Sequence, residues 1–169
     1  MRSQIVAGVT EEIPPTGAVP AYRPDWVPVR GHHLWRCGVH FDVVRMPGPY
    51  GRAVAARLRE LVAPGDAGAV VYEEKGGGWT YFLLPPNSAD DYTWPADVER
   101  LSGPRTIAYV GVPALPGAGN TWPLSWCSPP TRVAPFVEPE VLLDVLLDGR
   151  LSPPAPPAGT GAGRRSRRP

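Results

Sequence analysis

The chain has 169 residues, of which 43% are hydrophobic, and this length and composition suit one globular domain with a buried core. Its 24 prolines and 19 glycines exclude long uninterrupted helices and predict short elements joined by many turns. No apolar run approaches the length of a membrane span, so we expect no membrane partner. The first residues lack the apolar region of a signal peptide, so we expect a cytoplasmic protein in which both cysteines, Cys37 and Cys127, are free thiols.

Charge is divided unevenly along the chain. Residues 1–149 carry 12 basic and 16 acidic side chains, a net charge of −4, whereas residues 150–169 carry five arginines and no acid. Because phosphate binding depends on basic side chains, we expect any nucleic-acid contact to come mainly from the tail. The candidate residues for this contact are Arg164, Arg165, Arg167 and Arg168.

Composition also divides the chain into three segments. Residues 1–21 are weakly patterned and predict a flexible N-terminal arm, and residues 22–149 predict one α/β domain. Residues 150–169 are rich in proline and glycine and end in arginines, which is typical of a disordered tail. At the start of the domain, residues 22–36 mix aromatic residues with prolines. We expect them to cross the core as an extended segment held by Trp26 and Trp35.

The domain is predicted to begin with a β-α-β-β sequence of elements. Residues 39–46, VHFDVVRM, are nearly all apolar, which is typical of a strand buried on both faces. Residues 49–62 place apolar side chains at helical spacing and predict an amphipathic helix. Residues 69–74 and 79–84 are two strand-like runs separated by a lysine and three glycines, so they predict a β-hairpin.

The second half of the domain predicts less regular structure. We expect a loop over residues 85–104 with a short helical stretch near 95–101, and a strand over 105–112. A second strand over 121–127 contains Pro123 and is therefore predicted at a sheet edge. A final helix is predicted to begin near Glu138 and to end at Gly149.

The fold class that follows is α+β, or α/β, in one small domain. About five strands and two to three helices are expected, with the helices covering one face of the sheet.

The densest group of polar side chains is His32, His33, Cys37, His40 and Asp42. His40 and Asp42 alternate along the predicted strand and are therefore expected on the same face. Cys37 and His40 have a spacing used in zinc sites, but no second pair of ligands accompanies them, so we predict no metal site. The competing interpretation makes Cys37 a small buried residue and places His32 and His33 in a surface loop.

Asp42 stands inside an apolar strand, where a lone carboxylate is costly unless it is paired or hydrogen-bonded. One interpretation is an acid that handles a metal ion or a phosphate at a strand end. The other is a structural acid that faces solvent or pairs with Arg45 or Arg36. The three glycines after Lys75 precede a strand and no Lys-Ser/Thr follows, so they predict a hairpin turn and not a phosphate loop.

Four blocks of sequence, taken in order, carry a resemblance. They are GVHFDVVRMPGPYGRAVAARL, GAVVYEEKGGGWTYFLLPPNSADDY, SWCSPP and EPEVLLDVLL. From about Val29 to Gly149 the chain resembles a group of small actinobacterial proteins, some of which distantly resemble the N-terminal domain of bifunctional DNA primase/polymerases. That family carries an Asp-x-Asp pair at a strand end that binds divalent metal, and a histidine on a later strand. Here Asp42 matches the first acid, whereas Val44 and Thr80 stand at the other two positions.

The resemblance therefore implies a prim-pol-like domain without catalytic activity. Such a domain would act as a binding or interaction module with nucleic acid or a protein partner, and would need no cofactor of its own. The alternative is an enzyme of nucleotide or phosphate chemistry with its site around His40, Asp42 and Arg45. On the domain itself, the candidate nucleic-acid contacts are Arg45 and Arg52.

Overall fold

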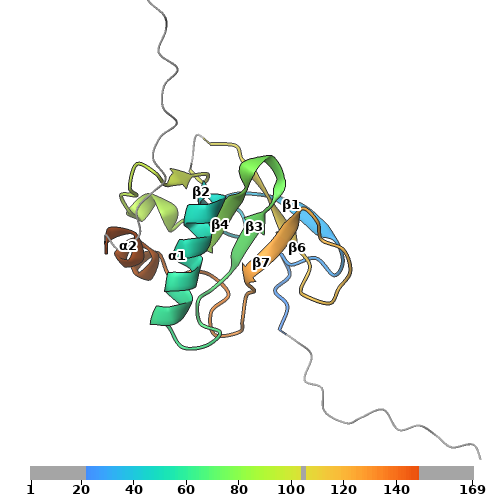
Figure 1. Ribbon diagram of the computed structural model, residues 1–169. Coiled ribbons are helices and arrows are strands. Elements are labelled where there is room, and N and C mark those ends of the chain that lie inside the picture. The colour runs from blue at the N-terminus through green and yellow to red at the C-terminus, as the bar shows by residue number, and fades with distance from the viewer. Residues whose placement is uncertain (1–21, 104–105, 149–169) are drawn as a thin grey trace, which may run out of the picture.

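The structure is a computed structural model that describes residues 22–103 and 106–148 (Figure 1). Within these residues the fold is α+β, as predicted, with two α-helices and seven strands in two sheets. The predicted arm over residues 1–21, the tail over 150–169 with its four candidate arginines, and Gly149 lie outside the described residues.

A five-stranded antiparallel sheet forms the centre of the molecule. Its strands are β2 (Asp42–Pro47), β3 (Val70–Glu73), β4 (Trp79–Leu84), β5 (Glu99–Arg100) and β7 (Leu124–Ser128), in the spatial order β5-β2-β4-β3-β7. The predicted hairpin is confirmed as β3 and β4, joined by the 3₁₀ turn η1 (Lys75–Gly77). The last predicted strand lies at the sheet edge as expected, and it starts directly after Pro123.

The two central strands, β2 and β4, are buried on both faces. Val44 and Phe82 are fully buried on one side of the sheet, while Val43 and Leu83 are fully buried on the other. Because side chains alternate along a strand, this double burial explains why both strands are nearly continuous runs of apolar residues.

Helices α1 (Gly48–Leu61) and α2 (Pro139–Leu147) cover one face of the sheet, as predicted (Figure 1). Helix α1 lies close to β4 because residue 51 is a glycine. A Cβ atom at that position would be 2.4 Å from the Cβ of Thr80. Neither helix of the described part has the length and apolar character that crossing a membrane requires.

The opposite face is covered by a second sheet that the sequence did not predict. Strand β1 (His32–Arg36) pairs with β6 (Tyr109–Pro113), and Val110 and Val112 of β6 join the core on this side. The segment over residues 22–36 is not extended throughout, because the Val27 N–H donates to the Pro24 carbonyl oxygen at 2.9 Å and closes a turn. Trp26 is buried, and the indole N–H of Trp35 donates to its carbonyl oxygen at 2.7 Å. The last five residues of the segment form β1.

One prediction about the second half was wrong, and the bounds of another change. Residues 95–101 do not form a helix: Glu99 and Arg100 pair with the outer edge of β2, and the short helix η2 (Ala89–Asp91) comes earlier. Two contacts draw this segment onto the sheet, the Leu101 N–H bond to the Val43 carbonyl oxygen and the ion pair between Arg45 and Glu99. The strand predicted over 105–112 is present as β6 (Tyr109–Pro113), and the described residues contain seven strands where about five were expected.

Helix α2 contains one buried and one exposed leucine, so substitutions of the two give a test of core packing and its control. Leu142 is fully buried beside α1, whereas Leu147, in the same helix, is 67% exposed. We expect Leu142→Ala to reduce the free energy of unfolding by about 2–5 kcal/mol, because it leaves a cavity in the core. Leu147→Ala should change it by less than about 0.5 kcal/mol. Urea unfolding of both variants measures the difference, and equal losses would contradict this packing of α2.

Candidate binding pocket

Asp42 is the first residue of β2 and its side chain is almost completely enclosed, with 3% of the residue exposed. Its Oδ2 atom accepts a hydrogen bond of 2.9 Å from the backbone N–H of Ala89, at the start of η2. This bond offsets part of the cost of burying a carboxylate. The Oδ1 atom has no hydrogen-bond partner among the described residues, and the residue lines a pocket.

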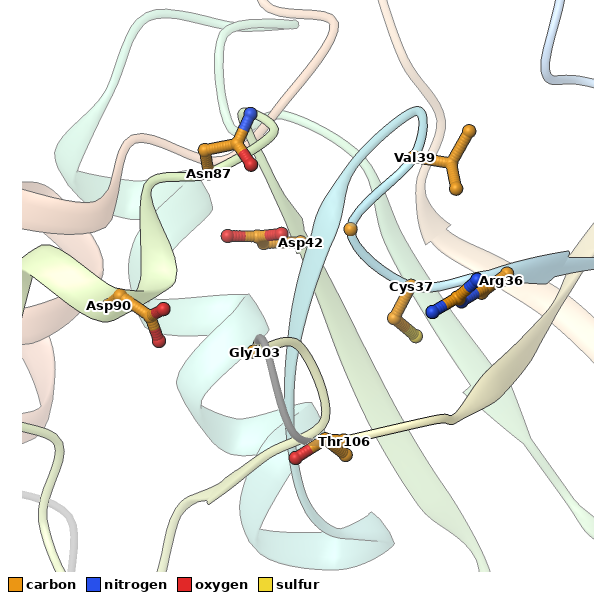
Figure 2. A pocket seen from close by; sticks show the side chains of 9 residues that line it. Arg36, Cys37, Val39, Asp42, Asn87, Asp90, Gly103 and Thr106 are labelled. Carbon is orange, nitrogen blue, oxygen red and sulfur yellow. The ribbon is translucent and has the colours of Figure 1, made fainter.

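The pocket has a volume of about 460 Å³, which is within the range of small-molecule sites. Its lining is Arg36, Cys37, Gly38, Val39, Asp42, Asn87, Asp90, Gly103 and Thr106. Figure 2 shows that Asp42 points from β2 toward the segment that carries Asn87 and Asp90, whereas Arg36, Cys37 and Val39 lie on the other side. Among the described residues, the lining therefore has acidic side chains on one side and one arginine on the other.

Local contacts fix both walls. On one side, the chain turns sharply between β1 and β2, where Gly38 has a φ of +85° and its N–H donates to the Phe41 carbonyl oxygen at 2.8 Å. This left-handed conformation favours glycine. On the other side, the carboxylate of Asp90 forms an ion pair with Arg100 of β5. The buried hydroxyl of Ser102 accepts the Val43 N–H at 2.8 Å and ties the segment before Gly103 to β2.

Cys37 is a buried thiol in the pocket wall and not an activated nucleophile. Burial raises the pKa of Cys37 to about 11, and the negative charge of Asp42 contributes to the same shift. Burial also raises the pKa of Cys127 above its ordinary value. Both cysteines are free, as predicted.

The three residues of the alternative enzyme site are not brought together. His40 was expected to share a strand face with Asp42, but the strand begins only at Asp42 and His40 lies in the preceding turn. Its ring packs edge-on against Trp35, with 4.4 Å between the ring centroids. Arg45 lies three residues after Asp42 and therefore on the other face of β2. There it pairs with Glu99 at 2.8 Å and covers the ring of Trp79.

The structure also shows where the other polar candidate residues lie. His32 and His33 are exposed in strand β1 and not in a surface loop, which corrects that expectation. Arg52 is exposed on α1, with its guanidinium 4.8 Å from the ring centroid of Tyr72. Among the described residues, no three histidine, cysteine or acidic side chains are close enough together to hold a metal ion.

The two positions that the primase/polymerase resemblance assigns to further metal ligands lie in the core. Val44 and Thr80 are both fully buried beneath α1, and the Thr80 hydroxyl donates to the Gly48 carbonyl oxygen at 3.2 Å. Two-metal phosphoryl transfer needs several carboxylates that converge on the ions. The residues present therefore do not fit that metal site.

Asn87, Asp90 and Thr106 were not predicted as part of the site. They come from connections between strands and reach Asp42 only through the pairing of β5 with β2 and the docking of η2. One feature of the sequence could have indicated them, because residues 87–91 are turn-forming and acidic and follow a strand. No local pattern shows that they lie beside Asp42.

Comparisons with known proteins leave this geometry to be interpreted by itself. No family model, no curated protein and no solved structure matches the chain.

The proximity of Cys37 to Asp42 is directly testable. At about pH 8.5, alkylation of Cys37 by iodoacetamide should be about a hundredfold slower than that of a free cysteine, because little thiolate is present. Asp42→Asn should accelerate this reaction, since it removes a negative charge with almost no change in size. Peptide mass spectrometry measures the rate at each cysteine. Asp144→Asn, an exposed acid on α2, is the control, and equal rates in the two variants would show that Asp42 does not act on Cys37.

Proposed function

We propose that this chain is a prim-pol-like binding domain without nucleotidyl-transfer activity, and that the pocket at Asp42 is its binding site. The observation that carries the proposal is the buried carboxylate itself. It lies at the end of a central strand, one oxygen is held by the Ala89 N–H, and the residue lines a cavity large enough for a small molecule. The described residues form no ion pair with Asp42, and a carboxylate buried in this way is costly, so a ligand that donates hydrogen bonds to it would be favoured.

The chemistry of the walls indicates the class of ligand. A carboxylate only accepts hydrogen bonds, so the Asp42 side of the pocket suits hydroxyl or amino groups. Arg36 lies on the opposite side of the pocket from Asn87 and Asp90 and suits a phosphate. A nucleoside with a phosphate group carries both kinds of group at opposite ends, so we assign the pocket to a nucleotide.

Placement of the side chains supports binding over catalysis. The positions where the resembling family has its second carboxylate and its histidine are Val44 and Thr80, and both are enclosed by core residues. Arg45 and His40 are engaged elsewhere, by Glu99 and Trp35. We further propose a cytoplasmic protein, where its two free thiols would stay reduced. Any additional contact with nucleic acid would come from the tail arginines and from Arg52.

Binding can be measured with a nucleoside triphosphate in equilibrium dialysis. We expect Asp42→Asn to weaken binding about tenfold or more, because a hydrogen bond to a charged group is worth about 1.5–3 kcal/mol. The asparagine keeps an oxygen that accepts the Ala89 N–H, so the fold should be retained. Asp144→Asn on α2 is the matched control and should bind like the unmodified protein. Equal affinities of the two variants would overturn the assignment of the pocket.

The absence of catalysis is a separate prediction. We expect no template-dependent incorporation of labelled nucleotide above the level of an Asp42→Ala variant, with manganese or magnesium present. The reason is that Asp42 is the only one of the three family positions that carries a metal ligand. Incorporation that disappears in the Asp42→Ala variant would show that the domain is an enzyme.

A further inference from the structure

Among the described residues, nothing pairs with one edge of strand β1, which is called its free edge here. Two hydrogen bonds at the ends of β1 fix the direction of its backbone groups: the Ala114 N–H donates to the Gly31 carbonyl oxygen, and the Cys37 N–H donates to the Ala108 carbonyl oxygen. In this register the backbone N–H and C=O groups of the odd-numbered residues of β1 point toward β6. The N–H and C=O groups of His32, Leu34 and Arg36 therefore point away from β6. No residue of the described part forms a hydrogen bond with them, and β1 pairs with no other strand.

Proteins usually protect such an edge with charge, proline, a bulge or a covering segment, because an open edge pairs readily with another strand. The β1 edge has no proline or bulge, and in its middle Leu34 is 61% exposed. Beside Leu34 is a second cavity of about 170 Å³, lined on one side by Leu34, Tyr109, Val110 and Leu124. Its polar lining includes His32, Tyr81 and Glu73, and the Glu73 carboxylate accepts a hydrogen bond from the Tyr81 hydroxyl. This volume suits one aliphatic side chain.

The charged side chains around the edge indicate what kind of partner would bind there. Arg30 and Arg36 are exposed at the two ends of β1, and neither has an ion-pair partner among the described residues. A second copy of this chain paired antiparallel about Leu34 would set Arg36 against His32 and bring the arginines of both copies together. Like charges across strands are destabilising, so this arrangement is disfavoured. An acidic strand would instead place carboxylates beside unpaired guanidinium groups.

We propose that β1 binds an extended acidic peptide of a protein partner, which adds to its free edge as a further strand. Backbone hydrogen bonds to His32, Leu34 and Arg36 would supply affinity, as in other cases of strand addition. An aliphatic residue opposite Leu34 would enter the small cavity, and acidic residues two positions before and after it would face the ends of β1. The recognised pattern is therefore acid-x-aliphatic-x-acid, where the x positions lie on the face of Trp35.

The test uses the full chain and a fluorescent peptide in which threonines separate a glutamate, a leucine and a second glutamate. Leu34→Pro removes an outward N–H and leaves the hydrogen bonds to β6 in place, so it should reduce affinity about tenfold or more. Leu34→Thr keeps the N–H and a strand-forming residue but removes part of one wall of the small cavity, so it should reduce affinity less than Leu34→Pro does. Fluorescence anisotropy measures the affinities, and circular dichroism checks that both variants are folded.

A second measurement leaves the protein unchanged. Methylation of alternate backbone nitrogens of the peptide should abolish binding, and replacement of its glutamates by lysines should weaken binding at least tenfold. Equal binding of the methylated peptide, or of the lysine peptide, would overturn the proposal.

Two other results would also overturn the proposal, because each would show that a different molecule binds the edge of β1. A dimer in sedimentation that Leu34→Pro abolishes would show that a second copy covers the edge. Binding of an oligonucleotide in place of the peptide, lost in Arg36→Gln but retained in Leu34→Pro, would show that the arginines serve a phosphate backbone. Because Leu34 does not line the Asp42 pocket, nucleotide binding by the Leu34 variants is independent of either outcome.

Discussion

The burial of β2 and β4 on both faces is the constraint on which the rest of the structure depends. A strand pair that is apolar on both sides needs two covers, and the chain supplies α1 with α2 on one side and β1 with β6 on the other. Asp42 is polar, yet it begins one of these strands. It therefore lies at the margin of both layers, where the chain must supply a backbone N–H from Ala89 and leave a cavity beside the carboxylate.

Local signals in the sequence were sufficient for the central elements. The apolar run before Pro47, the helical spacing after it, the glycine-rich turn and the final helix each act within a few residues, and each is present within one to three residues of its predicted bounds. The sheet of β1 and β6 was not predictable in this way. It joins residues more than seventy positions apart, and four of the five residues of β1 are exposed, so no apolar pattern marks it.

The candidate site was predictable only in part, for a related reason. Asp42 was recognisable because a carboxylate inside an apolar strand needs an explanation. Its neighbours were not, because the expected companions His40 and Arg45 were chosen by closeness in sequence. Alternation along the strand sends Arg45 to the opposite face, and the true strand start leaves His40 in the turn. Asn87 and Asp90 reach the pocket through long-range docking of η2, which no local pattern encodes.

Strand β1 links the two proposed binding surfaces and is poorly explained by folding alone. Its free edge and its exposed side chains contribute little apolar burial, with the exception of Trp35, which packs against the core and contacts the rings of His33 and His40. A strand that existed only to cover the sheet would be expected to place apolar residues inward and charged residues along its edge. Here Leu34 is outward, and Arg36 at the end of the strand lines the Asp42 pocket. Arg36 therefore belongs to both proposed binding surfaces, the edge of β1 and the lining of the Asp42 pocket.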